Sequence, residues 1–299
     1  MKKILSIMIL AAAFSAASAQ TLPSLLVNAD PAAMGAAGIS ALGSDAHALQ
    51  GYAASSALME GMVAAGVSYA SWQPKAASDK VLDASASVLL MEKFSVALEY
   101  KGFTQPEYEV TGATGAVSQV TPTFTPKESS IALGLGYRIM PGLAAAVTVR
   151  STSSVLAKDA KASAFGIDVS AAYSKDKLQA GLAVCNLGGK VNYGGGDYSQ
   201  PSLFKAGAAY EAVKGLKAGA EVSYLFAGAF GASLGAEYCI AGMAFARAGY
   251  HLGSKDLGIP SFASVGLGAE FAGAALNFAY LLASDTVGGS LLVGLSYAF

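Results

Sequence analysis

The stretch GGSLLVGLSYAF, residues 288–299, ends the chain and decides the fold class. Alternate residues on one face are large and apolar, and the residues between them are mostly small or polar. This strict alternation predicts a β-strand with one apolar face. A closing strand that ends on an aromatic residue is typical of outer-membrane barrels, whose interfaces carry aromatic girdles. We therefore take Leu295, Tyr297 and Phe299 as a C-terminal signal for the barrel assembly machinery.

The chain begins like a secretory signal peptide. Lys2 and Lys3 precede the apolar run 4–14, and the small residues 17–19 fit a cleavage site. We expect residues 1–19 to be removed after Sec-dependent export. A membrane-anchoring helix is the alternative, but the apolar run is short and the cleavage site follows it directly.

The composition indicates a membrane protein, with 54% hydrophobic and only 13% charged residues. After the signal peptide, no uncharged apolar run approaches the roughly 20 residues that a membrane helix needs. A closed barrel is the other structure that satisfies the backbone inside lipid. The net charge of −1 gives no argument for a nucleic-acid partner. Lipid of the bacterial outer membrane is therefore the expected surrounding.

From residue 61 onward the chain divides into alternating segments of about ten residues, which is the signature of a transmembrane barrel. We predict an all-β barrel of about fourteen antiparallel strands over residues 61–299. The strands are expected near residues 61–72, 80–91, 94–104, 129–140, 143–155, 162–174, 178–187, 202–212, 216–226, 229–239, 243–252, 262–272, 274–284 and 288–299.

Charged residues favour a membrane barrel over a soluble β-sandwich or barrel, which also alternates. They fall on the strand face opposite the apolar residues, where a charge avoids the roughly 2–4 kcal/mol that it costs in mid-membrane. Aromatic residues gather near both strand ends, as two membrane interfaces favour. The inward charges, our lumen candidates, are Glu99, Arg138, Arg150, Asp168, Glu221, Glu237, Arg247 and Glu270.

Loop lengths predict the orientation. The connections 104–128, 188–201 and 253–261 are long and lie on the same side in the predicted up-down order, whereas the opposite connections are all tight. Because outer-membrane barrels have short periplasmic turns, we expect a periplasmic N-terminus. The segment 104–128 is either a docking surface or a lid over the barrel mouth.

Residues 20–60 are rich in Ala, Gly and Ser and show no sustained alternation. A barrel of about fourteen strands encloses a lumen, so we predict that 24–58 form a hatch that enters from the periplasmic side. Within it, residues 34–38 are expected to make a tight turn. Ser44 or Asp45 is expected to cap a short helical turn that runs through Leu49.

Several motifs resemble one family in order and spacing. They are DPAAMGAAG at 30–38, the Asn-Leu-Gly strand exit at Asn186, Leu187 and Gly188, KAGAAY at 205–210, and RAGY at 247–250. On these residues the chain resembles the PorV/PorQ family of Bacteroidetes outer-membrane proteins, itself similar to the FadL family. The chain departs from the family at Tyr52, Ala53 and Ala54, which stand where the family has Asn-Pro-Ala, so the family's hatch geometry does not carry over there.

The resemblance implies two functions. PorV/PorQ members include a type IX secretion component that engages secreted proteins, which implies a non-enzymatic protein that assists export, with secreted proteins or other secretion-system components as partners. FadL relatives pass hydrophobic molecules through a hatch and a lateral gap, which implies a transporter or channel for hydrophobic or small solutes. Similarity of fold does not choose between them.

The sequence gives little support for catalysis, a cofactor or a metal. His47 falls in the hatch and His251 near the outer rim, no nucleophile elbow is present, and no Cys/His cluster has metal-ligand spacing. Cys185 and Cys239 are expected to be unpaired. We expect the lumen acids to pair with the lumen arginines and, with Tyr52, to hold the hatch, because paired charges tolerate burial better than single ones. A polar path for a solute is the alternative.

Overall fold

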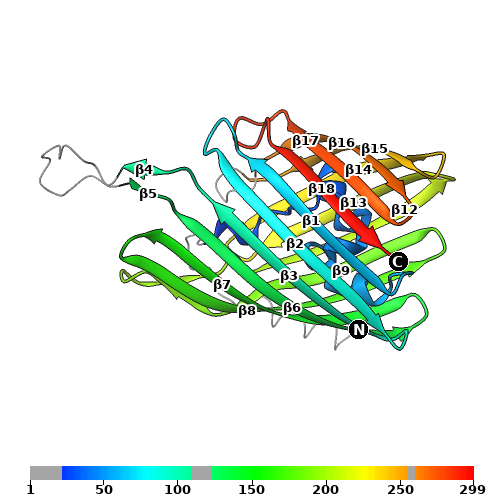
Figure 1. Cartoon of the computed structure of the whole chain (residues 1–299), viewed down its shortest axis with the longest axis horizontal. Helices are drawn as coiled ribbons and strands as arrows, with labels where there is room; N and C mark the ends of the chain where they lie inside the picture. The colour runs from blue at the N-terminus through cyan, green and yellow to red at the C-terminus, as the bar shows by residue number, and fades with distance from the viewer. Residues whose placement is uncertain (1–21, 110–122, 255–259) are drawn as a thin grey trace, which may run out of the picture.

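The computed structural model describes residues 22–109, 123–254 and 260–299, and it is a closed antiparallel barrel (Figure 1). Fourteen strands form the wall in the order β1-β18-β17-β16-β15-β14-β13-β12-β9-β8-β7-β6-β3-β2. This confirms the predicted fold class. The predicted signal peptide, residues 1–19, lies outside the described residues.

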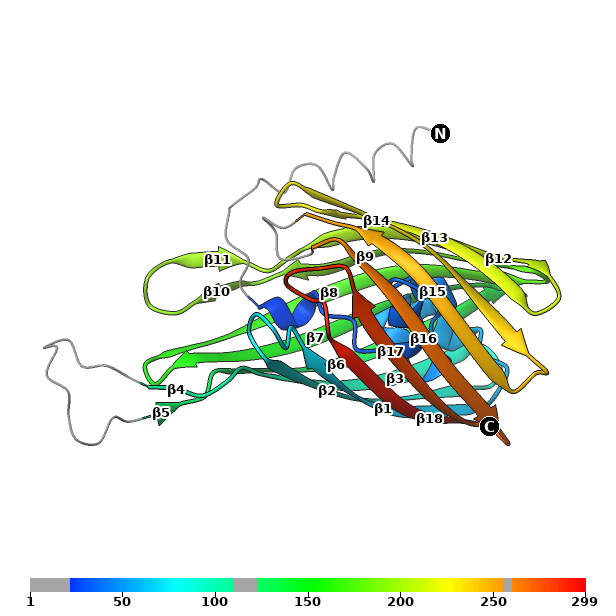
Figure 2. The ribbon, with the colours of Figure 1, turned by 90° about the horizontal axis from the view of Figure 1, so that it is seen from above.

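The observed strands begin and end within a few residues of the predicted ones. Those of the wall are β1 Val63–Trp72, β2 Asp79–Leu90, β3 Phe94–Thr104, β6 Lys127–Met140, β7 Leu143–Ala157, β8 Ala160–Lys175, β9 Leu178–Gly188, β12 Leu203–Val213, β13 Leu216–Leu225, β14 Ala229–Ile240, β15 Ala244–Leu252, β16 Phe262–Phe271, β17 Ala274–Leu282 and β18 Leu291–Ala298. Two short hairpins, β4 Tyr108–Glu109 with β5 Thr123–Phe124 and β10 Lys190–Asn192 with β11 Asp197–Ser199, extend from one end of the barrel (left in Figures 1 and 2).

The two ends of the barrel differ. We call the end with the two hairpins the loop end and the opposite end, which holds Phe299, the terminal end (Figure 1). Tight turns at the terminal end place Gly142, Gly215 and Gly273 at φ values of 82°, 83° and 81°, a conformation that glycine adopts without a steric penalty. At the seam between β1 and β18, the carbonyl of Phe299 accepts hydrogen bonds from the backbone of Met62 and Val63.

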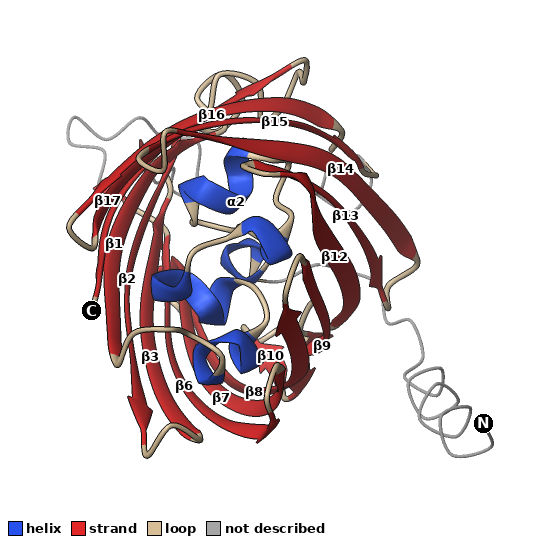
Figure 3. Ribbon diagram, turned by 90° about the vertical axis from the view of Figure 1, so that its right-hand side faces the viewer, coloured by secondary structure: helices blue, strands red, loops and turns tan. Residues whose placement is uncertain are grey.

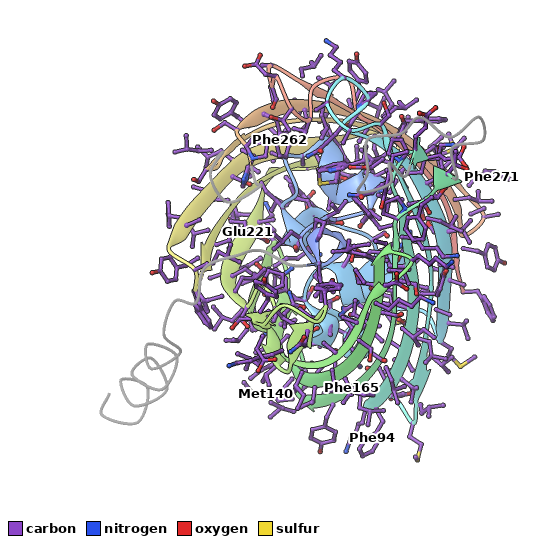
Figure 4. The ribbon with its side chains drawn as sticks, turned by 90° about the vertical axis from the view of Figure 1, so that its left-hand side faces the viewer. Phe94, Met140, Phe165, Glu221, Phe262 and Phe271 are labelled. Carbon is purple, nitrogen blue, oxygen red and sulfur yellow. The ribbon has the colours of Figure 1, made fainter. Side chains whose placement is uncertain are left out.

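The wall is apolar outside and polar inside. Leu98, Leu133 and Leu234 are more than two-fifths exposed on the outer face, whereas the charged side chains in the middle of the strands are buried. Figure 4 shows Phe94 and Phe165 pointing outward and Glu221 lying inside the barrel. This arrangement keeps ionisable groups away from hydrocarbon, as the alternation predicts.

The N-terminal segment lies inside the barrel (Figure 3). Its helices, which we call the hatch together with their connections over residues 22–60, are η1 Pro23–Leu25, α2 Pro31–Gly35, η2 Ser40–Leu42, η3 Asp45–Gln50 and η4 Ala53–Ala57. None of the helices in the described part of the chain is long and apolar enough to cross a membrane. The helical turn expected after Ser44 is present, although the Ser44 side chain makes no capping bond.

The tight turn predicted over 34–38 is only partly correct, because a short α-helix precedes it. Asp30 caps α2 by accepting a hydrogen bond from Ala32 N, and Pro31 occupies the first helical position. Both are ordinary helix-start signals. The prediction of a turn rested on the small residues of this segment and did not take these signals into account. The turn follows the helix, with Ala37 and Gly38 at positive φ.

Small residues on both sides let the hatch approach the wall. A Cβ on Gly266 of β16 would lie only 2.8 Å from Gly35 Cα, and a Cβ on Gly249 of β15 would lie 2.8 Å from the Ala37 Cβ. Alanines of η4 pack on alanines of β3, β6, β7 and β8 in one buried cluster. At these contacts the hatch therefore meets the wall through backbone and methyl groups rather than through long side chains.

The outer face gives a direct test of membrane embedding. Val149, in the middle of β7, is exposed on this face, whereas Leu156 belongs to the inward phase of the same strand and is exposed near the loop end, at the register shift between Val155 and Ala157. We expect Val149→Arg to lower the free energy of unfolding in lipid bilayers by about 2–4 kcal/mol, and Leu156→Arg to lower it by at most about 1 kcal/mol. Urea titrations in vesicles measure both, and equal losses would contradict the placement of the wall in the membrane.

Candidate functional site

The hatch leaves two cavities in the lumen. The loop-end cavity has a volume of about 330 Å³, and its lining includes Trp72, Phe103 and Phe262. The terminal-end cavity has a volume of about 370 Å³, and its lining includes Glu270 and Phe299. Phe262 lies inside the barrel in Figure 4, which looks from the loop end.

Four hatch residues line both cavities. They are Asn28, Ser40, Gln50 and Gly51. The two cavities therefore approach each other at this part of the hatch. We call these four residues the partition.

Two charged wall residues hold the partition. Lys205 Nζ of β12 donates to Ser40 Oγ and to the Gln50 carbonyl, both at 3.2 Å. Glu221 of β13 accepts from Ser40 N at 3.0 Å and from the Tyr52 hydroxyl at 2.7 Å. We call Lys205, Glu221 and Tyr52 the latch, because their hydrogen bonds connect the hatch to the neighbouring wall strands β12 and β13.

Tyr52 fits this sector closely. Burial raises the pKa of its hydroxyl and the Glu221 carboxylate raises it further, so the phenol stays protonated and donates its hydrogen bond. Its ring lies against Gly181 of β9, where a Cβ would overlap the ring atoms. The residue that replaces the family's Asn-Pro-Ala motif is thus a direct hatch-to-wall contact in this chain.

Two groups of lumen charges pair as the sequence predicts. Arg150 Nη1 lies 2.7 Å from Glu99 Oε1, and its Nη2 lies 3.5 Å from Asp168 Oδ2. Arg150 and Glu99 reach each other across β6 because the residue between them in the register is Ala132. Separately, Arg247 Nε lies 2.7 Å from Glu237 Oε2, its direct cross-strand partner.

Three other candidate charges form no ion pair among the described residues. Arg138 Nε donates to the carbonyl of Ala57 in η4, at 2.8 Å. Glu221 binds the hatch instead of an arginine, as described above. Glu270 is exposed at the terminal end, where it lines the cavity. The prediction of pairing is therefore wrong for these three, because the hatch or the solvent takes the place of the second charge.

Two wall contacts of the hatch lie outside the predicted candidates: Asp83 was not predicted to face inward, whereas Lys101 was, on the same face as Glu99. Asp83 lies 2.8 Å from His47 Nδ1 and accepts a bond from Gln50 Nε2 at 2.7 Å. Lys101 Nζ donates to the Val27 carbonyl at 2.9 Å. Asp83 and Lys101 lie on the inward face of β2 and β3, so the same alternation that identified Glu99 was a signal for them.

The Asn-Leu-Gly motif marks a bulge in the wall. The β8–β9 register shifts between Ile167 and Val169, and Asn186 has a φ of 59°. Asp168 accepts from Asn186 N at 2.6 Å, and Asn186 Nδ2 donates to the Pro201 carbonyl at 3.0 Å. Leu187 and Gly188 complete β9 beyond the bulge. A β-bulge bends a strand and re-aims its side chains, here at the rim of the loop-end cavity.

The remaining candidates are the C-terminal residues and the two cysteines. Leu295, Tyr297 and Phe299 point outward, and their role in assembly stays a prediction. Cys185 and Cys239 are both free, as expected. In the described ranges, no cluster of three His, Cys, Asp or Glu side chains is arranged to hold a metal ion.

No protein-family model matches the chain, and no curated protein matches its sequence. Solved structures do. The Ralstonia pickettii toluene transporter TbuX has 10% identity and a TM-score of 0.64 over 90% of this chain and 98% of its own. The Pseudomonas putida toluene transporter TodX has 12% identity and a TM-score of 0.65 over the same shares. A Pseudomonas aeruginosa FadL homologue has 13% identity and a TM-score of 0.54 over 90% and 95%.

At these identities the similarity defines the fold. The chain has the outer-membrane barrel fold of these proteins, the FadL homologue among them. The finer resemblance to PorV/PorQ stays a prediction.

The buried charge cluster is expected to be essential for stability. Arg150→Met leaves Glu99 and Asp168 buried without their cation, so we expect a loss of about 3–5 kcal/mol in the free energy of unfolding. Arg138→Met removes one hydrogen bond of a half-buried side chain and should cost about 1.5 kcal/mol. Urea unfolding in vesicles compares the two, and the cluster is not essential if Arg150→Met is the milder change.

The contact between Tyr52 and the wall predicts a coupled pair. Gly181→Ala is expected to destabilise the protein by about 1–3 kcal/mol, because its methyl group overlaps the Tyr52 ring. In a Tyr52→Ala background the same change should have no such cost. Gly195→Ala, which has open space around it, is the matched control. Equal effects of Gly181→Ala in both backgrounds would show that the two residues do not interact.

Proposed function

We propose that the protein is a conduit for small hydrophobic compounds across the bacterial outer membrane. The observation that carries this proposal is the pair of cavities in one lumen, whose linings share the four hatch residues of the partition. Displacing that part of the hatch would join the cavities into a path. The loop end would face the exterior and the terminal end the periplasm.

The lining of the loop-end cavity supports a hydrophobic solute. Trp72, Phe103, Phe262, Met34 and Val287 give the cavity an apolar part, and polar and charged residues line the rest. Two of the charged residues, Lys101 and Lys205, bond to the hatch. Apolar surface combined with placed polar groups is typical of small-molecule sites. The compared structures named as toluene transporters agree with this class of solute.

The latch explains how the path would be closed at rest. Lys205 holds Ser40 and Gln50 of the partition, and Glu221 holds Ser40 and the adjacent Tyr52, all through hydrogen bonds. A hatch of small residues has little side-chain bulk to withdraw when these bonds break. Opening the path then requires local displacement of the hatch, while the wall stays closed.

Handling of secreted proteins is the other hypothesis from the sequence, and the compared structures give it no support. Its natural docking surface, the connection 104–128, lies largely outside the described residues, since 110–122 are not described. Flux of a small solute separates the two hypotheses, because a docking protein needs no open path.

A reversible cross-link between hatch and wall tests the conduit. Ser56 Oγ of η4 and Ser95 Oγ of β3 lie 2.8 Å apart, so cysteines at both positions are placed to form a disulfide. With Cys185 and Cys239 replaced by serine, we expect Ser56→Cys/Ser95→Cys to abolish toluene uptake into proteoliposomes when oxidised and to restore it when reduced.

Each single cysteine variant is the matched control and should be unaffected by oxidation. Glu221→Gln, which weakens the latch, should raise uptake severalfold. An uptake that is the same with the cross-link formed or broken, or that equals uptake into protein-free liposomes, would rule out a path through the hatch.

A further inference from the structure

In one corner of the loop-end cavity lies a hydrogen-bonding group to which the hatch gives no partner. His251 of β15 lines this cavity, is 8% exposed, and stacks on Phe262 with 5.1 Å between the ring centroids. Met34, Leu203 and Val287 add apolar surface to the same cavity. The imidazole is therefore a polar group set in an apolar lining.

The hydrogen bonds of His251 fix which of its nitrogens carries the proton. Ser233 Oγ donates to the Ala37 carbonyl at 2.8 Å and lies 2.9 Å from His251 Nδ1. A serine hydroxyl has a single proton, so toward the imidazole it accepts, and Nδ1 carries the hydrogen. No described carboxylate forms an ion pair with this ring. In the neutral ring, Nε2 is then a bare acceptor.

Nε2 is buried and has no hydrogen-bond partner among the described residues. Buried acceptors without a partner are rare in proteins, and each asks for an explanation such as a ligand or a water. The neighbouring position is Gly231, where a Cβ would lie 3.1 Å from His251 Cε1 and 2.7 Å from Ser223 Oγ. The absence of a side chain there leaves this edge of the ring uncrowded.

The cations of the same cavity are already engaged. Arg150 is paired with two acids, Lys101 donates to the Val27 carbonyl, and Lys205 donates to the partition. Three acids, Asp79, Asp168 and Glu221, equal these three cations in number in the lining. At His251 Nε2, which is an acceptor, a carboxylate ligand would bring two acceptors together, whereas a neutral hydrogen-bond donor finds a free acceptor.

We infer that the loop-end cavity selects small, neutral, hydrophobic compounds that carry a hydroxyl group, and that this hydroxyl donates to His251 Nε2. The inference rests on the proposed function, and it specifies the solute as an alcohol or a phenol rather than a bare hydrocarbon or a fatty acid anion. It makes His251 the residue that distinguishes these compounds.

Trp72 supplies the measurement, because it is the only tryptophan of the chain and lines this cavity. Its fluorescence in the purified full-length barrel is titrated with cyclohexanol, methylcyclohexane and cyclohexanecarboxylate, which share one ring and differ in one group. Calorimetry checks the same three affinities. We expect cyclohexanol to bind and cyclohexanecarboxylate to bind at least tenfold more weakly.

Three variants separate the acceptor from the ring. His251→Asn can keep the bond to Ser233 but places nothing at Nε2, and should weaken cyclohexanol binding about tenfold while leaving methylcyclohexane unchanged. His251→Gln places a carbonyl oxygen near the position of Nε2 and should restore most of that affinity. Tyr250→Phe, on the outer face of the same strand, is the control and should change neither affinity.

The wild-type protein alone gives a second test, should the variants fail to fold. Methoxycyclohexane is more hydrophobic than cyclohexanol but has no hydroxyl to donate, so we expect it to bind severalfold more weakly. Equal or tighter binding of this ether, tighter binding of the carboxylate, or equal losses for the alcohol and the hydrocarbon in His251→Asn would each overturn the inference.

These outcomes are distinct from failure of the conduit. Binding is measured on the purified protein without flux, so His251-dependent binding with no uptake into liposomes would defeat the proposed function and leave the binding site in place. Uptake that is gated by the hatch but indifferent to His251 and to the hydroxyl would defeat the inference alone.

Discussion

The buried polar groups of this protein can find partners only inside the barrel, because the outer face of the wall meets hydrocarbon. The strands satisfy their own backbone by closing into a ring. Their inward charges need more, and the hatch supplies it through backbone carbonyls, amides and short side chains. Removing the hatch would leave groups such as Lys101, Glu221 and Asp83 without the contacts described above, so wall and hatch are one structure in energetic terms.

The same constraint explains why the proposed functional features lie where packing or hydrogen bonding in the lumen is incomplete. Most of the lumen is filled by alanine and glycine contacts that leave no space for a solute. The exceptions are the two cavities, the partition between them, and nine buried side-chain atoms without a partner among the described residues, of which His251 Nε2 is one. A lumen in which every polar group was hydrogen-bonded and every space was packed would be more stable, but no solute could enter it. Natural proteins depart from complete packing and hydrogen bonding mainly at functional sites.

Alternation alone predicts the wall, because a period of two residues reports directly on which face meets lipid. It also predicts Glu237 with Arg247, which face each other across a hairpin with a tight turn. The pair of Glu99 and Arg150 is harder to predict from the sequence, because the two residues lie on strands that a third strand separates. Their contact depends on Ala132 of that strand being small. The hatch is the part that is hardest to predict, because its sequence has no regular alternation of apolar and polar residues. Contacts such as that of Tyr52 with Gly181 depend on where the hatch lies in the lumen.

The position of the hatch in the chain has a consequence for how the molecule is made. It precedes β1, yet α2 contacts β15, β16, β17 and β18, the last strands to be synthesised, while η4 contacts β6, β7 and β8. Such contacts between distant parts of a chain form late and slowly. The contacts of α2 and the β1–β18 seam therefore both await the last strands to be made. The part of the chain that is synthesised first completes its contacts only when the part that is synthesised last is present.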